Sequence, residues 1–177
     1  MKINFDFSNA KEHTGLKFIP AGKHTVKIKE VESKTTTNGH PQLVITFEDK
    51  EGRTFDHYQL ANTEYDWVIN WFYNFAKNAG LKVEKGQFAL DTNELIGKPM
   101  FIDIKREFND YTGKYRNNLK YTAPYDKDKV DEWNEEYPIS DEEKAFKENG
   151  ENSSKKEDNP FADTDGPVDI SSDDLPF

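Results

Sequence analysis

Hydrophobic and polar residues alternate over five short stretches of the first 125 residues, a pattern that predicts half-buried β-strands. In the first stretch, which begins at Gly22, Val26 and Ile28 share one face while Val31 falls out of phase. A β-bulge explains such a slip, because one extra residue inverts the facing of the residues that follow. The other four stretches are residues 43–48, 53–60, 100–105 and 115–121.

One helical stripe separates the third stretch from the fourth. Apolar residues recur at helical spacing from Tyr65 to Ala79, and Gly80 is a typical end signal. Thr63, followed three residues later by Asp66, predicts a capping pair at the start of this helix. Because such stripes usually mark burial, we expect the aromatic helix to pack under a sheet and not to stack bases.

Three strands, a helix and two further strands follow the element order of an OB-fold, a small barrel that binds single strands in many proteins. Other small mixed sheets share this order. The expected fold is mainly β with one main α-helix, a five-stranded OB-fold barrel followed by a disordered acidic tail.

Charge is distributed unevenly along the 177 residues, whose formal net charge is −10. Residues 126–177 hold 18 acids and 6 bases, a net of −12, whereas residues 1–125 hold 16 acids and 18 bases, a net of +2. We therefore expect a folded domain over residues 1–125 and an acidic, largely disordered tail over residues 126–177. Residues 140–170 are too charged and too poor in aliphatic side chains to offset the entropy of ordering. This division argues against a DNA mimic, which would carry its carboxylates on a folded surface.

The residues that enzymes and metal sites require are missing or wrongly spaced. The chain has no cysteine, and its four histidines, His13, His24, His40 and His57, show no metal-ligand spacing. There is no glycine-rich phosphate loop and no serine in a nucleophile-elbow context. We expect no catalytic residue, no metal and no cofactor. Without a signal peptide or a membrane-spanning run, a cytoplasmic location is expected, with no membrane partner.

Single-stranded DNA is the ligand that the domain's composition suits. Of the 24 aromatic residues, 19 precede residue 126, so aromatic and basic residues share one domain. Aromatic rings stack on bases, while lysine and arginine follow the phosphates without reading sequence. The candidate contacts are the outward-facing bases and aromatic residues of the predicted strands and loops: Lys27, Lys29, Lys34, Arg53, Tyr58, Phe101, Lys105, Tyr111, Lys114, Arg116 and Lys120.

The end of the chain presents an aromatic side chain, the terminal carboxylate and two adjacent acidic side chains together. The residues concerned are Asp173, Asp174, Leu175, Pro176 and Phe177. This stretch resembles the tip of bacterial and bacteriophage single-stranded DNA-binding proteins. The resemblance implies that the tip recruits replication or recombination proteins, such as a helicase, primase or polymerase.

Most of the domain also resembles one group of phage single-stranded DNA-binding proteins. The stretches that carry the likeness are residues 21–28, 67–75, 95–99 and 107–114. The resemblance implies a protein that coats and protects single-stranded DNA during phage DNA replication, recombination and repair, in the cytoplasm of a bacterial host. Two alternatives stay open, an acidic-tailed adaptor that binds only proteins and a strand-annealing recombination mediator. Homo-oligomerisation also stays open.

Overall fold

The computed structural model describes residues 2, 4, 6–8 and 17–155, with side chains as far as residue 150. The chain divides into two compact units, Met1–Tyr137 and Pro138–Phe177. The first unit contains the sheet and extends beyond the domain boundary predicted at residue 125. Residues 173–177, the predicted interaction tip, lie outside the described residues.

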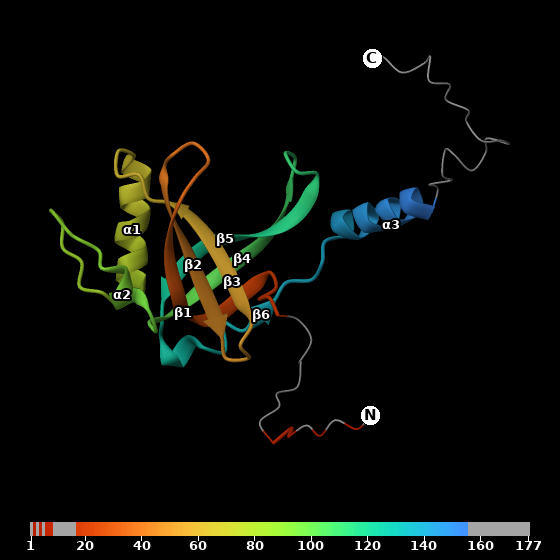
Figure 1. Cartoon of the computed structure of the whole chain (residues 1–177), viewed down its shortest axis with the longest axis horizontal. Coiled ribbons are helices and arrows are strands. Elements are labelled where there is room, and N and C mark those ends of the chain that lie inside the picture. The colour runs from red at the N-terminus through yellow and green to blue at the C-terminus, as the bar shows by residue number, and fades with distance from the viewer. Residues whose placement is uncertain (1, 3, 5, 9–16, 156–177) are drawn as a thin grey trace, which may run out of the picture. The chain divides into compact units, whose positions relative to one another are not determined.

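The first unit is mainly β with one main α-helix, as the sequence predicts (Figure 1). Its strands are β1 (Gly22–Thr35), β2 (Pro41–Asp49), β3 (Thr54–Leu60), β4 (Pro99–Asn109), β5 (Lys114–Pro124) and β6 (Glu135–Glu136). Its helices are α1 (Asp66–Asn78), the short α2 (Thr92–Leu95) and the single 3-10 turn η1 (Lys127–Lys129).

The strands form one antiparallel sheet in the order β3-β2-β1-β4-β5, and β6 pairs with β1. This connectivity is that of a partly open, five-stranded OB-type barrel. The register between β1 and β2 shifts between Ile28 and Glu30, which confirms the bulge predicted from the phase of Val31. Long β1 curves around the barrel and therefore pairs with β2, β4 and β6 along different parts of its length.

Among the described residues no strand ladder joins the two edge strands, β3 and β5, so other segments fill the seam between them. Near Thr54 the chain before β1 pairs with β3, since the Ile19 amide donates to the Thr54 carbonyl at 3.0 Å. On the other side of the seam, Asn117 of β5 donates its side-chain amide to the Ile19 carbonyl at 3.4 Å. Residues 17–19 thereby connect the two edges where a β3–β5 ladder would close the barrel.

Helix α1 covers the rest of the seam and contributes Phe75 to the core. Trp71 stacks on His57 of β3 with ring centroids 5.4 Å apart, and Asn78 donates to the Thr122 hydroxyl of β5 at 2.9 Å. Val68, Phe75 and Ala76 are at most 2% exposed, which confirms burial for the middle and end of the predicted stripe. Tyr65 and Ile69 at its start are exposed. The predicted Thr63 cap is wrong, because the helix begins two residues later than a cap at Thr63 would place it.

The capping residue of α1 is Tyr65, which makes no side-chain capping bond. Thr63 lies before it in an exposed turn. The sequence pattern therefore located the helix but misplaced its first turn by a few residues, which is the usual uncertainty of helix ends.

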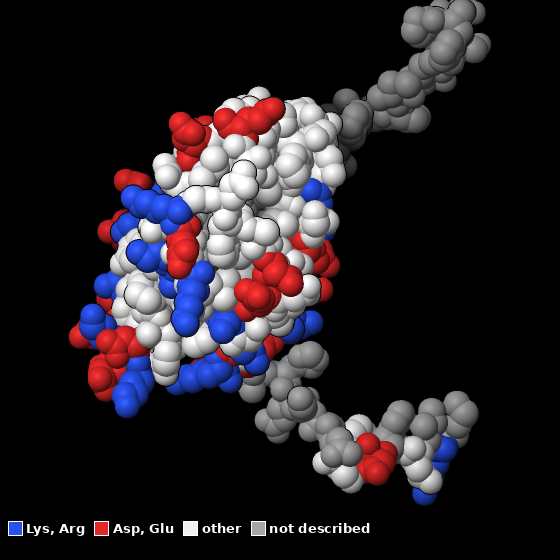
Figure 2. Space-filling model, turned by 90° about the vertical axis from the view of Figure 1, so that its left-hand side faces the viewer, with Lys and Arg blue, Asp and Glu red and all other residues white. Residues whose placement is uncertain are grey.

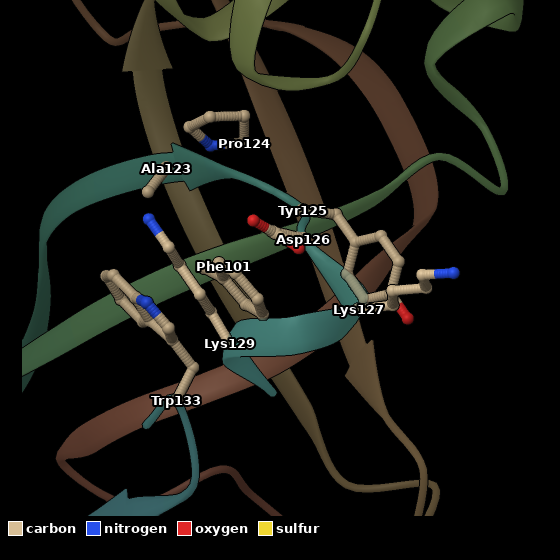
Figure 3. A pocket seen from close by; sticks show the side chains of 8 residues that line it. All are labelled: Phe101, Ala123, Pro124, Tyr125, Asp126, Lys127, Lys129 and Trp133. Atoms are coloured by element: carbon tan, nitrogen blue, oxygen red, sulfur yellow. The ribbon is translucent and has the colours of Figure 1, made fainter. Parts of the chain in front are cut away.

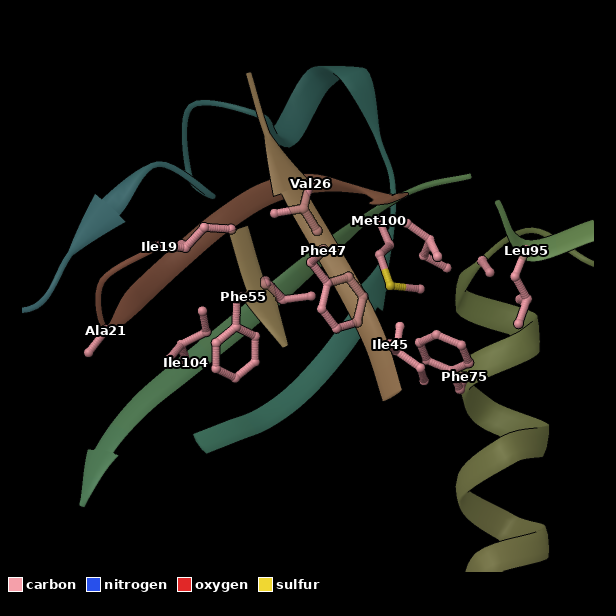
Figure 4. Packing of buried hydrophobic residues seen from close by; sticks show 13 residues of the cluster. Ile19, Ala21, Val26, Ile45, Phe47, Phe55, Phe75, Leu95, Met100 and Ile104 are labelled. Carbon is pink, nitrogen blue, oxygen red and sulfur yellow. The ribbon is translucent and has the colours of Figure 1, made fainter. Parts of the chain in front are cut away.

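The hydrophobic core lies between the inner faces of the strands and α1 (Figure 4). Phe47 stacks on Phe55 and meets Phe75 edge-on, both with ring centroids 6.4 Å apart. Ile45 and Met100 are fully buried beside them. These are the inward positions that alternation along β2 and β4 predicts.

A segment that follows the barrel, residues 126–137, packs back over the outer face of β1 and β4; we call it the strap. Strand β6 at its end pairs with the edge of β1 at Gly22 and Lys23, before β2 begins to pair at Val26. The approach is close, because a Cβ atom on Gly22 would lie 2.1 Å from the Glu135 carbonyl oxygen. Within the strap, the one helical segment that the structure describes is the turn η1.

The second unit contains one described helix, α3 (Asp141–Lys155), in a stretch where disorder was predicted. The structure corrects that prediction for these residues. The Ser140 hydroxyl caps the helix by accepting the Glu143 amide at 3.2 Å, and Asp141 lies in the first turn, where the helix dipole favours an acid. Lys147 lies one turn after Glu143, 3.4 Å from its carboxylate. Local capping and pairing thus favour a helix despite the poor hydrophobic content.

Candidate nucleic-acid interface

The β4–β5 hairpin is a long two-stranded arm whose outer face gathers several of the predicted contacts. Directly opposed residues of an antiparallel pair point to the same side of the sheet, and alternate residues of one strand share a face. The register places Glu107 opposite Arg116 and Lys105 opposite Asn118. With Lys114 nearer the tip, these side chains form one face of the arm, which we call the hairpin face.

Glu107 organises the middle of the hairpin face. Its carboxylate lies 2.6 Å from the Lys105 ammonium and accepts a hydrogen bond from the Asn118 amide at 2.9 Å. These contacts, Lys105 first, hold the pKa of Glu107 below its ordinary value, so the acid stays charged at neutral pH. An anion that approaches Lys105 therefore competes with Glu107.

The tip of the hairpin presents Tyr111 entirely to solvent. The Asn109 side chain accepts the amides of Tyr111 and Thr112 at 2.9 and 3.1 Å, and Gly113 has a positive φ of 65° that the turn requires. The relative exposure of Tyr111 is 101%, so both faces of its ring are open. A base could stack there without displacing any protein contact.

The other end of the hairpin face meets the barrel at a second bulge, which lies between Asp103 and Ile104. Lys120 is the additional residue in β5, and its ammonium lies 3.8 Å from the buried Asp103 carboxylate and 5.8 Å from the ring of Tyr121. Tyr121 is 43% exposed on the same face.

Residues 105–120 contain five bases and two acids, a net charge of +3, which exceeds the net charge of +2 of the predicted domain, residues 1–125. Positive charge is therefore concentrated on the hairpin. Figure 1 shows the hairpin and the β1–β2 turn projecting from the same end of the barrel.

The outer face of β1, β2 and β3 holds another group of predicted contacts, but there each base is matched by acids. Lys27 and Lys29 both contact Glu48, at 3.1 and 2.7 Å, and Lys34 contacts Glu32 at 3.0 Å. The charged side chains on this face are three lysines and four acids, and an exposed tyrosine lies among them: Lys27, Lys29, Lys34, Glu30, Glu32, Glu48, Asp56 and Tyr58. This face offers phosphates no excess of positive charge.

The structure corrects the outward facing predicted for two contacts, because the strap covers Phe101 and ion pairs engage the partly exposed Arg53. Phe101 is 1% exposed, since Trp133 stacks on it with ring centroids 5.0 Å apart and planes 2° apart. Arg53 donates to Asp49 at 2.7 Å and to Glu136 at 2.9 Å, which holds the strap to the β2–β3 turn. Alternation along the strands gave no sign of this cover, because it comes from residues beyond the predicted boundary.

The helical side of the molecule shows no patch of a single sign. Figure 2 views the side on which α1 and α2 lie in Figure 1, and there bases and acids are mixed around an uncharged area. Among the described residues, no group of His, Asp or Glu has an arrangement that could hold a metal ion, and no helix is long and apolar enough to cross a membrane.

A known protein family matches the chain over its barrel. Residues 3–131 match the model of a family described as a protein of unknown function, DUF669. The chain belongs to this family. The DUF669 match spans all five barrel strands, α1 and the first part of the strap. No curated protein matches the chain.

The DUF669 barrel also shows aromatic and basic residues that the sequence prediction of contacts omitted. Tyr121 and Tyr125 follow the candidate bases of β5, and Lys129 and Trp133 belong to the strap. The boundary drawn at residue 125 explains the omission of Lys129 and Trp133, but not that of Tyr121 and Tyr125, which lie within it. Val130 and Trp133, three residues apart in an acidic stretch, were the signal that this stretch packs against the domain.

Proposed function

We propose that this DUF669 protein binds single-stranded DNA without sequence preference, and that the strand lies along the hairpin face. The observation that carries the proposal is the excess of bases on residues 105–120 beside the fully exposed ring of Tyr111. Lys114 and Arg116 contact phosphates, while Tyr111 stacks on a base. None of these contacts reads a base edge, so any sequence serves.

The resemblance to phage single-stranded DNA-binding proteins supports a wider proposal. The protein coats and protects single strands during phage replication and recombination, in the cytoplasm of the bacterial host. Its terminal residues 173–177 recruit a helicase, primase or polymerase. A terminal aromatic side chain buried in a partner's pocket contributes about 1.5–3 kcal/mol, a weak contact that several copies on one strand would reinforce.

Titration of a labelled oligo(dT) strand with the full chain tests the DNA-binding proposal. The affinity should fall steeply as salt rises, because counterions are released from the phosphates. Tyr111→Ala should weaken binding by about 1–3 kcal/mol, the usual contribution of one stacked base. Lys114→Ala should weaken binding and its salt dependence, because a phosphate contact is lost. Lys50→Ala is its matched control and should change neither, since Lys50 is an exposed lysine in the β2–β3 turn.

A protein that fails to bind oligo(dT) even at low salt would leave the protein-only adaptor as the better account. The recruitment proposal has a separate test, a pulldown from phage-infected host extract with the full chain and with a chain lacking Phe177. The deletion should lose replication proteins and keep its affinity for DNA. Equal recovery by both chains would contradict the role of the tip.

A further inference from the structure

A pocket of about 510 Å³ opens where the outer face of the β4–β5 hairpin meets the strap. Its floor is the cross-strand pair Phe101 and Ala123. Tyr125 and Trp133 form walls, and Figure 3 shows them on opposite sides of Phe101. The volume falls within the range of about 300–1,000 Å³ that small-molecule sites occupy.

The rings around this pocket differ in mobility and access. Trp133 is fixed, because its ring lies parallel to Phe101 and meets Tyr121 edge-on at 5.7 Å. The Tyr125 ring is tilted by 49° from Phe101, with centroids 5.6 Å apart, and the residue is 43% exposed. A rigid aromatic floor beside an accessible, tilted ring suits a flat aromatic ligand, which gains by stacking.

Two bases and one acid line the pocket, Lys127, Lys129 and Asp126, so its net positive charge suits a ligand that also carries an anion. Lys129 is exposed, and within the described part of the chain its ammonium takes part in no ion pair. Figure 3 shows its side chain extending across the pocket toward Ala123. An aromatic ring and an anionic group within reach of one ammonium describe a nucleotide, with its base on Tyr125 and its phosphate at Lys129.

The pocket is continuous with the hairpin face. Ala123 on its floor shares the outer side of β5 with Tyr121 and, beyond the bulge, with Arg116 and Lys114. At about 3.3 Å per residue, the distance along β5 from Lys114 to Ala123 is about 30 Å. A strand of about nine stacked nucleotides covers this distance, at about 3.4 Å for each.

The geometry points to a nucleotide subsite in the pocket formed by Phe101, Tyr125, Lys129 and Trp133, which takes one base of the strand whose other part lies on the hairpin. This inference rests on the proposed function. It sets the direction of the bound strand, along β5 from the tip to the strap. It also sets a minimum length, below which a strand bound to the hairpin cannot reach the pocket.

The test compares the affinities of two oligo(dT) strands, of about 15 and about 4 nucleotides, for the full chain and its variants. Tyr125→Ala should weaken binding of the longer strand about tenfold and leave the shorter strand nearly unchanged. Tyr125→Phe keeps the ring and should bind as the unmodified chain does. Tyr65→Ala is the matched control, because Tyr65 is 41% exposed and lies outside the pocket, at the start of α1.

Lys129→Ala provides a second variant, since an exposed lysine is replaced without disturbing the packed rings. It should lower the slope of log affinity against log salt by about 0.7 for the longer strand only. If the hairpin variants weaken binding but Tyr125→Ala and Lys129→Ala do not, or if both strand lengths respond alike, the pocket is not a subsite and the proposed function still stands. If the unmodified chain binds neither strand, both proposals fall together.

Discussion

Replacing Glu107 by glutamine should strengthen the binding of single-stranded DNA. The carboxylate holds Lys105 at 2.6 Å and lies opposite Arg116, so it occupies the position that a phosphate would take on the hairpin face. Glutamine keeps an oxygen that can accept the Asn118 hydrogen bond. It removes only the negative charge and releases Lys105.

The expected gain is modest, because the pair is near the surface. The Lys105 and Glu107 side chains are 42% and 43% exposed, so water screens their charges. Two unit charges about 4 Å apart in water interact by about 1 kcal/mol, and salt reduces this further. Removal of the competing acid should therefore contribute about 0.5 kcal/mol, a gain of about twofold to threefold in affinity. The free energy of unfolding should change by less than about 1 kcal/mol, as for other exposed pairs.

Fluorescence anisotropy with a labelled oligo(dT) strand measures this gain, and a matched pair on the other face provides the control. Glu32 contacts Lys34 at 3.0 Å on the outer face of β1, and the two side chains are 48% and 50% exposed. Glu32→Gln removes the same charge from the same kind of pair. It should leave the affinity almost unchanged.

Two results would refute this reasoning. Unchanged or weaker binding by Glu107→Gln would show that no phosphate approaches Lys105. An equal gain from Glu32→Gln would show that only the net charge of the protein matters, and that the hairpin face has no special role.

Three further predictions concern the strap and the buried histidines. Burial and a hydrogen bond to the buried Asp103 carboxylate of β4 raise the pKa of Tyr137 to about 12. The folded state therefore favours the neutral phenol, and this stabilisation is lost as pH rises from about 10 through about 12. Tyr137→Phe should lower the free energy of unfolding by about 1–3 kcal/mol at neutral pH and remove that alkaline loss, both measurable by denaturant unfolding; an unchanged variant would contradict the anchoring role. Gly22→Ala should destabilise the protein by at least about 1–3 kcal/mol, because its Cβ would collide with the Glu135 carbonyl; a melting temperature equal to that of the unmodified chain would exclude the close approach. Burial lowers the pKa of both His24 and His57. The stability that these histidines contribute is therefore present above about pH 6.5 and is lost as pH falls through their folded-state pKa. NMR titration should give both histidines a pKa below the ordinary value, and an ordinary pKa for both would contradict this prediction.

The local features of the barrel were predictable because they depend on neighbours in the sequence. The phase of Val31 located the bulge in β1, and the inward positions of β2 follow from strict alternation. Asparagine and glycine favour turns, and at Asn109 and Gly113 the structure shows the side-chain bonds and the positive φ that such a turn uses.

The facing of β4 was not predictable in the same way. Phe101 and Asp103 alternate with the core residues, a pattern that predicts exposed side chains, yet both are 1% exposed. Their cover comes from the strap, whose Trp133 packs on Phe101 and whose Tyr137 donates to Asp103 at 3.0 Å. Alternation shows only which residues share a face. Whether that face is exposed to solvent depends on whether a segment distant in the sequence covers it.

The sequence could not distinguish the candidate contacts on the hairpin from those on β1, for a related reason. Sequence alone identified Lys105, Lys114 and Arg116 as outward bases, but it equally identified Lys27 and Lys29. Only the strand register shows that Glu48 lies opposite the β1 lysines and neutralises them. The choice between the two faces thus depends on cross-strand pairing, which one-dimensional spacing does not determine.

The salt dependence of oligo(dT) binding by two triple variants tests the central claim most directly. One variant replaces Lys105, Lys114 and Arg116 by alanine, and the other replaces Lys27, Lys29 and Lys34. Each lost phosphate contact should lower the slope of log affinity against log salt by about 0.7, so the hairpin variant should lose about 2 from the slope and bind weakly. The β1 variant should keep nearly the slope of the unmodified chain. A reduced slope in the β1 variant alone, or no salt-dependent binding by the unmodified chain, would contradict the assignment of the hairpin as the DNA-binding surface.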